Sequence, residues 1–254
     1  MINISVQHDF DRITESLDDM AKVQVPFALA RALNDTADAV KAAEVREMKD
    51  VFDRPTPTTL NAVYVKRATK MNLVAEVGLK DFAGKGIPAT KYLAAEIDGG
   101  SRRLKRFEVA LVRAGVMPED MRAVPGEAAQ MDAYGNMLGS QIVQILSFFK
   151  AFPELGYKAN MSDKRRAQLA KGSKTRQGFA YFVGRPADGK FPLGIWQRFQ
   201  FARGSSAIKP VLIFVPHTIY QAVFDFGYVV QKTVDRTFPA TFQQRLAEAM
   251  AAAK

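Results

Sequence analysis

A proline-containing stretch ends the longest helical pattern in the chain. Residues 26–50 repeat apolar side chains on one narrow stripe at helical spacing, with charged residues on the other faces. The next stretch, DRPTPTT at 53–59, cannot continue a helix, because proline lacks a backbone N–H and its ring clashes with the preceding turn. We therefore expect two parts: an N-terminal helical arm, residues 1–53, and a body, residues 54–254.

The charge of the chain changes at the same boundary. Residues 1–53 hold 6 Lys and Arg against 11 Asp and Glu, a net charge of −5, whereas the body has a net charge of +15. An acidic arm on a basic body predicts self-association or contact with acidic partners, and it also permits nucleic-acid binding. The sequence contains no cysteine, which excludes disulfides and thiolate metal sites.

The order of the helical and strand patterns predicts the fold class α+β: a long N-terminal helical arm and a mainly antiparallel sheet with C-terminal helices. The expected helices cover 8–22, 26–50, 89–97, 103–114, 138–151, 218–235 and 240–253, with one short helix within 158–178. The expected strands form a hairpin over 60–79 and a three-stranded meander at 179–184, 193–201 and 208–215. Pro26 and Pro239 are expected to separate successive helices, and Thr218 to cap the helix that begins there. Residues 80–178 form an insertion-like middle region of the body.

One apolar run, residues 210–231, has the length of a membrane span. Polar residues and a proline interrupt it, including Pro216 and Asp225, and a charge at the centre of a span is costly. We therefore expect a strand followed by a helix, and no membrane partner. The N-terminus lacks the pattern of a signal peptide.

Basic residues cluster in two places in the body. One cluster follows Gly99–Gly100, which we interpret as a turn because the spacing of a phosphate-binding glycine loop is missing. The other cluster lies within 158–178, where few aromatic residues accompany the charges, so that solvated or protein-facing charge is favoured over a DNA contact. The candidate contacts to a partner or to DNA are Arg102, Arg103, Lys105, Arg106, Lys164, Arg165, Arg166, Lys171, Lys174 and Arg176.

No convincing catalytic set is present in the sequence. The chain has two histidines far apart, His8 and His217, and its serines lack the context of a nucleophile elbow. Glu96 and Asp98 could act as an acid and base pair, but a helix end with a turn aspartate explains them better. We expect no enzyme activity, no cofactor and no metal site.

Three aromatic residues follow one another at four-residue spacing near the C-terminus. Tyr220, Phe224 and Tyr228 would form a second apolar stripe on the expected helix at 218–235, beside the face that meets the sheet. Simple burial and subunit packing explain such a stripe equally well. We name these three residues as a candidate subunit interface.

The two ends of the chain resemble a family of phage proteins. The segment 194–250 has Trp196 and Arg198 on a strand, a second strand ending PVLIFVP, and a helix leading to Phe238–Pro239; it resembles the end of the phage minor tail protein Z family. The segment VPFALARALNDTADAVKAAEVREM at 25–48 resembles that family's opening helix. These are tail-completion proteins of long-tailed phages, related in role to neck proteins at the head–tail junction.

The resemblance implies a structural virion protein without catalytic residues. It implies a homo-oligomeric ring that contacts other virion proteins such as the portal, tail tube or tail terminator, located in the virion and, during assembly, in the host cytoplasm. Whether the protein belongs to the tail of a long-tailed phage or to the neck of a short-tailed phage stays open. The alternative is a basic nucleic-acid-binding protein with nonspecific DNA contacts, and a third option is a carboxylate hydrolase that uses Glu96.

Overall fold

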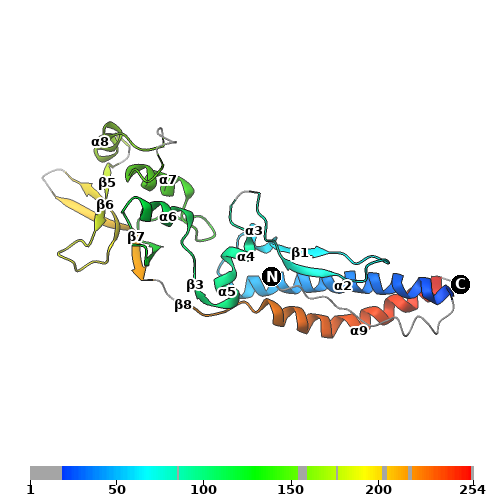
Figure 1. Cartoon of the computed structure of the whole chain (residues 1–254). Helices are drawn as coiled ribbons and strands as arrows, with labels where there is room; N and C mark the ends of the chain where they lie inside the picture. Colours follow the sequence, from blue (N-terminus) through cyan, green and yellow to red (C-terminus); the bar gives the residue numbers. More distant parts are fainter. Residues whose placement is uncertain are drawn as a thin grey trace. The chain divides into compact units, whose positions relative to one another are not determined.

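The computed structural model divides the chain into two compact units, and the division is not at residue 53. It describes residues 19–84, 86–153, 159–175, 177–201, 205–216 and 219–252, with side chains from residue 23 onward. Unit 1 contains Met1–Gly100 and Tyr220–Lys254, and unit 2 contains Ser101–Ile219. Unit 2 is therefore an insertion in the chain of unit 1 (Figure 1). The α+β class is confirmed, since helices and antiparallel strands occur together in the chain.

Two long helices from opposite ends of the chain are the main elements of unit 1. Helix α2 (Asp19–Val51) and helix α9 (Phe226–Ala252) lie side by side along their lengths (Figure 1). The stripe expected from the sequence is buried, as Ala30, Leu33 and Val40 are all under 7% exposed. Small alanines on this stripe permit close approach of the two backbones, while Phe226, Val230 and Phe238 supply apolar bulk from α9.

Prolines do not separate these helices as the sequence predicts. Pro26 lies inside α2 and Pro239 lies inside α9, so the expected helices at 218–235 and 240–253 are largely one helix. A proline in a helix interior costs about 3 kcal/mol. Burial of neighbours such as Val25, Ala28 and Phe238 offsets this cost, because packing of an apolar face contributes more to helix stability than local propensity does.

The hairpin is confirmed and packs on α2. Strands β1 (Val63–Lys66) and β2 (Glu76–Leu79) pair antiparallel with Val65 opposite Val77, and Thr69 bridges Asn72 at the turn. The side chain of Asn34 in α2 binds both backbone groups of Ala68: its amide donates to the carbonyl at 3.1 Å, and its oxygen accepts from the amide at 2.8 Å. Three short helices complete unit 1: α3 (Pro57–Leu60), α4 (Ala89–Tyr92) and α5 (Ala94–Asp98).

The expected acidic arm is not a separate part of the molecule. Asp35 of α2 pairs with Arg245 of α9 at 2.6 Å, and Asp38 pairs with Arg67 beside the hairpin at 3.0 Å. These carboxylates are occupied within their own unit. Asp35 and Asp38 therefore contribute to the packing of unit 1 itself.

Unit 2 contains a four-stranded antiparallel sheet in the order β4-β7-β6-β5. The meander is confirmed as β5 (Phe179–Gly184), β6 (Gly194–Gln200) and β7 (Ser206–Pro216). Strand β4 (Met121–Pro125) lies in the middle region, where the sequence predicts no strand, and it pairs with β7 with Ala123 opposite Phe214. It has no alternating pattern of its own, and its proline suits the sheet edge that it occupies.

Three helices cover one face of this sheet. They are α6 (Arg106–Arg113), α7 (Gly139–Phe148) and α8 (Asp163–Lys171). Leu111, Ile145 and Leu146 from α6 and α7 form one core with Tyr181, Ile195 and Leu212 from the strands. The remaining face of the sheet carries no helix among the described residues.

The chain passes between the units through two short strands that pair with each other, β3 (Gly100–Ser101) and β8 (Ile219–Tyr220). At Gly99–Gly100, where the sequence predicts a turn, Gly99 ends α5 and Gly100 begins β3, with φ angles of 71° and 88° that favour glycine. A Cβ at Gly99 would lie 3.1 Å from the carbonyl oxygen of Tyr220.

Helix α9 begins eight residues later than the sequence predicts. Thr218, the expected cap, lies outside the described residues, while Asp225 accepts a hydrogen bond from the backbone of Tyr228 at 2.9 Å and caps the helix. The backbone amides of Val223 and Phe224 donate to the carbonyl of Glu96 at 2.9 and 3.0 Å. These bonds keep residues 221–225 outside the helix.

One ionisable side chain is buried in unit 1 without compensation. Glu44 of α2 is 0% exposed, and neither of its carboxylate oxygens has a hydrogen-bond partner among the described residues. Burial, followed by the negative charges of Glu47 and Asp225, raises the pKa of Glu44 from 4.5 to about 8. The carboxyl group is therefore protonated at neutral pH in the folded protein.

We predict that Glu44 makes the protein less stable as the pH rises from about 4.5 to about 8. The folded state holds the proton in this window and the unfolded state releases it, so the free energy of unfolding falls by up to about 1.4 kcal/mol per pH unit. Glu44→Gln should abolish this slope in urea unfolding measured across the pH series. The matched control, Glu47→Gln, should keep it. An unchanged slope in Glu44→Gln would show that the carboxyl group is solvated.

Candidate functional site

The positive charge of the protein is concentrated in unit 2. Ser101–Ile219 hold 19 Lys and Arg against 8 Asp and Glu, a net charge of +11, whereas the residues of unit 1 hold 17 against 18, a net charge of −1. The difference in net charge therefore lies between unit 1 and unit 2, and not between an N-terminal arm and a body. A partner attracted by charge would bind unit 2.

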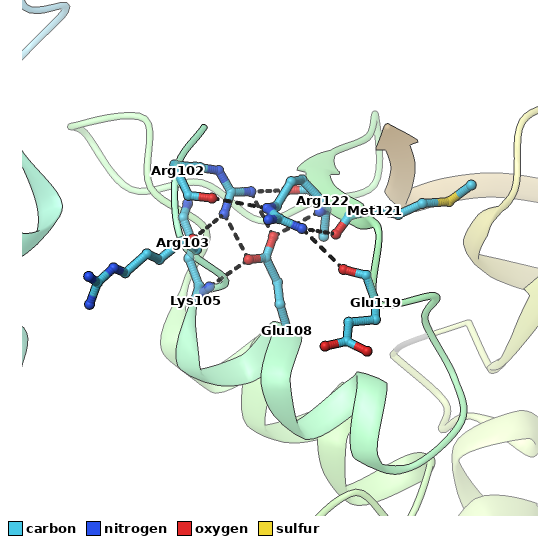
Figure 2. A network of polar contacts seen from close by, with 8 residues as sticks. Arg102, Arg103, Lys105, Glu108, Glu119, Met121 and Arg122 are labelled. Atoms are coloured by element: carbon cyan, nitrogen blue, oxygen red, sulfur yellow. Dashed lines mark hydrogen bonds and ion pairs between the residues drawn. The ribbon is translucent and has the colours of Figure 1, made fainter. Parts of the chain in front are cut away.

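The cluster after Gly100 is built around a buried carboxylate (Figure 2). Glu108 is 0% exposed, and its two carboxylate oxygens accept hydrogen bonds from the two terminal nitrogens of the Arg102 guanidinium, each at 2.7 Å. Glu108 is the third residue of α6, and it also accepts a hydrogen bond from the backbone amide of Lys105, which precedes the helix, at 2.6 Å. A further hydrogen bond comes from the backbone amide of Ala123 in β4 at 2.8 Å. One carboxylate thereby joins the start of α6 to the edge strand β4.

The electrostatics of Glu108 follow from these bonds. Burial by itself would raise the pKa of Glu108, but the hydrogen bonds from Arg102, Lys105 and Ala123 together outweigh it and hold the pKa below its usual range. Arg122 supports the pair by donating to the carbonyl of Arg102 at 3.1 Å and to that of Met121 at 2.8 Å. The ion pair therefore stays charged at neutral pH.

This network removes Arg102 from the candidate contacts. Its side chain is 19% exposed and its guanidinium is committed to Glu108, so it is a structural residue of unit 2. Sequence spacing could not reveal this, because the capping position of Glu108 signals a helix start but not an arginine partner. Arg103, Lys105 and Arg106 are exposed at the start of α6.

The second cluster splits in the same way. Arg166 of α8 is 29% exposed, donates to the carbonyl of Phe148 and lies over the ring of Phe148 at 5.1 Å, so it fastens α8 to the end of α7. Arg176 lies outside the described residues. The other four basic residues of this cluster are exposed, and none of their side chains has a hydrogen bond or ion pair within the described chain. We call them the α8 cluster: Lys164, Arg165, Lys171 and Lys174.

The three aromatic residues named as an interface do not share one surface. Phe224 is 0% exposed and packs edge-on against Phe52 at 5.4 Å and Phe226 at 6.0 Å in the core of unit 1. Phe224 is therefore not an interface residue, because α9 starts after it and its backbone is held by Glu96. Tyr228 is 60% exposed on α9, and Tyr220 is partly buried in β8.

The open face of the unit 2 sheet carries residues that the sequence analysis did not single out. A groove of about 850 Å³ there is lined by Phe182, Arg185, Arg198, Gln200, Phe201 and Ser206, among others; we call it the open-face groove. The alternation of β5 and β6 is the signal that could have found it. Phe179 and Tyr181 face the core, so Phe182 must face the other side, and Arg198 stands opposite Ala180 on that same side.

A second groove lies between α7 and α8. It has a volume of about 940 Å³ and a lining of amides, hydroxyls and a single cation: Ser140, Gln144, Ser147, Arg165, Gln168 and Gln177, with apolar side chains beneath. Gln144 already accepts a hydrogen bond from Tyr181 at 2.9 Å. This groove offers uncharged polar contacts and little charge.

The candidate metal-binding and acid–base residues do not form a site among the described residues. In the described ranges no set of three or more His, Asp or Glu residues is placed to hold a metal ion. Glu96 and Asp98 lie on the short helix α5, where Glu96 contributes its backbone carbonyl to unit 1. None of the helices in the described part of the chain has the length and hydropathy needed to cross a membrane.

Comparison with protein-family models, curated proteins and solved structures finds no match to this chain.

We predict that Arg102 acts in stability and not in binding. Arg102→Met leaves Glu108 buried without its cation, which should lower the free energy of unfolding by about 3–5 kcal/mol. The exposed neighbour provides the control, because Arg103→Ala should change it by less than about 0.5 kcal/mol. Chemical denaturation of both variants at pH 7 measures the difference. Equal stability of the two variants would mean that the ion pair contributes nothing to the fold.

Proposed function

We propose that this protein is a structural component of a tailed phage, a tail-completion or head–tail junction protein that acts by packing against copies of itself and other virion proteins. The observation that carries the proposal is the division of charge, with +11 on unit 2 and −1 on unit 1. Complementary potentials fix the register of assembling subunits and speed their encounter. A chain with one basic unit and one nearly neutral unit favours contact of the basic unit with an acidic partner.

The segments that resemble the tail-completion family support the same role. Residues 25–48 lie in α2 and residues 226–250 lie in α9, and these two helices pack on each other in unit 1. Residues 194–216 contribute β6 and β7 of unit 2. The resembling segments are thus structural elements of both units, while α6, α7 and α8 belong to the region between them.

The surface of the α2–α9 pair offers a place for a subunit contact. Tyr228 is 60% exposed, and the ammonium group of Lys232 lies 5.4 Å from the centre of its ring. Beside it is a hollow of about 250 Å³ lined by charges of both signs: Arg46, Glu47, Asp50, Lys232 and Arg236. Tyrosine is enriched among the residues that contribute most to the affinity of protein interfaces.

The direct test uses the phage or prophage that carries the gene. Mass spectrometry of purified particles should detect the protein, and a deletion should yield heads and tails that fail to join or tails that lack an end structure, seen by electron microscopy. A deletion that leaves normal, infectious particles without the protein would refute the proposal.

We predict that Tyr228 acts in assembly and not in folding. Because the side chain is exposed, Tyr228→Ala should change the free energy of unfolding by less than about 0.5 kcal/mol. It should weaken self-association or incorporation into particles by about 1 kcal/mol or more, which is about fivefold. Phe224→Ala is the contrasting variant, since removal of a buried phenylalanine ring should cost about 3–5 kcal/mol of stability. Normal assembly by Tyr228→Ala would exclude this surface.

The α8 cluster favours a second candidate function, nonspecific binding of duplex DNA. Its four exposed basic side chains can neutralise phosphates: Lys164, Arg165, Lys171 and Lys174. The described residues contain no recognisable helix or strand for contacting the edges of nucleobases. We predict weak duplex binding that falls steeply with salt. Lys164→Ala/Lys171→Ala should reduce the salt slope by about 0.9 for each phosphate that is no longer neutralised. Sequence-selective, submicromolar binding at physiological salt would contradict this prediction.

A further inference from the structure

The open-face groove combines flat aromatic surfaces with positive charge. The guanidinium carbon of Arg198 lies 4.5 Å from the centre of the Phe182 ring, so the cation is held against the ring. Phe201 lines the same groove and is 46% exposed. The groove thus presents an arginine plane and a phenylalanine ring to solvent within one hollow of about 850 Å³.

The cations of this groove are available to a ligand. Arg185 and Arg198 are exposed, and neither side chain has an ion pair or a hydrogen bond within the described residues. Asp188 is the carboxylate among the residues that line the groove, and Gln200 and Ser206 add polar groups that donate and accept hydrogen bonds. The balance of charge favours an anionic ligand.

We propose that the open-face groove binds single-stranded nucleic acid. Bases stack on the Arg198–Phe182 pair and on Phe201, Arg185 neutralises phosphate, and Gln200 and Ser206 contact sugar or base edges. Single strands suit such a surface because their unstacked bases expose π-faces that aromatic rings and guanidinium planes can cover. The bases of a duplex are already stacked on one another and cannot reach the rings.

Other classes of ligand fit less well. An acidic peptide would use the arginines but would gain little from a guanidinium already paired with a ring and a second exposed phenylalanine. An apolar ligand would leave two arginines and a glutamine without partners, which costs affinity. Single-stranded nucleic acid engages both kinds of group at once. This inference goes beyond the proposed virion role and does not depend on it.

The test measures binding of a labelled oligothymidylate of about 12 nucleotides to the full chain by fluorescence anisotropy. Wild type should bind it more tightly than a duplex of equal length. Phe201→Ala and Arg198→Ala should each weaken binding by about 5- to 150-fold, the equivalent of about 1–3 kcal/mol for one stacked base. Arg198→Lys should weaken it nearly as much as Arg198→Ala, because lysine keeps the charge and lacks the plane.

Matched controls separate stacking from general charge. Arg113→Ala, at the exposed end of α6 in the same unit and outside both basic clusters, removes one charge as Arg198→Ala does and should change single-strand affinity by less than about twofold. Each variant should melt within a few degrees of wild type, as expected for exposed positions. Equal weakening in Arg113→Ala and Arg198→Ala, full affinity in Phe201→Ala, or equally strong competition by polyglutamate would overturn the proposal.

Discussion

The packing of α2 against α9 is the contact on which the organisation of the molecule depends. The two helices come from opposite ends of the chain, and Arg245 reaches across 210 residues to Asp35. Closing so long a loop costs entropy, and the continuous apolar seam of Ala30, Leu33 and Val40 against Val230 and Phe238 compensates for that cost. Unit 1 is complete only when both ends meet. Unit 2 is inserted between them and has a core of its own.

This arrangement also explains how the charges are used. Asp35 and Asp38 of α2 pair with arginines of unit 1. Unit 1 is close to neutral because its 17 Lys and Arg nearly balance its 18 Asp and Glu. Unit 2 has a large excess of basic residues, and several of them stabilise its own structure, including Arg102 on Glu108, Arg122 on the carbonyl of Arg102, and Arg166 on the end of α7. Exposed basic residues remain on α6, α8 and the open sheet face. Binding by unit 2 is therefore a property of particular surfaces and not of the basic sequence runs as a whole.

The structural role that we propose and the nucleic-acid groove that we infer place different demands on the same fold. A junction protein needs stable, self-complementary surfaces, and the exposed tyrosine and mixed charges on the α2–α9 pair suit that need. A single-strand site needs an uncovered sheet face with planar groups, and unit 2 has one because α6, α7 and α8 all lie on the other face. The two surfaces named for these roles, Tyr228 on α9 and the open-face groove of unit 2, share no residue, so that each can be altered by its own variants.

Local patterns in the sequence determined the helix along residues 26–50, the hairpin, the meander and the glycine pair at the end of α5. Each depends on side-chain periodicity or on the backbone preferences of a few adjacent residues. Tertiary structure alone decided that Pro26 and Pro239 remain inside helices, that Phe224 is buried, that Arg102 is bound to Glu108, and that Arg198 lies on Phe182. In each of these cases the outcome depends on a packing partner or an ion-pair partner from another element. The spacing of residues along the chain carries no information about which partner will be near.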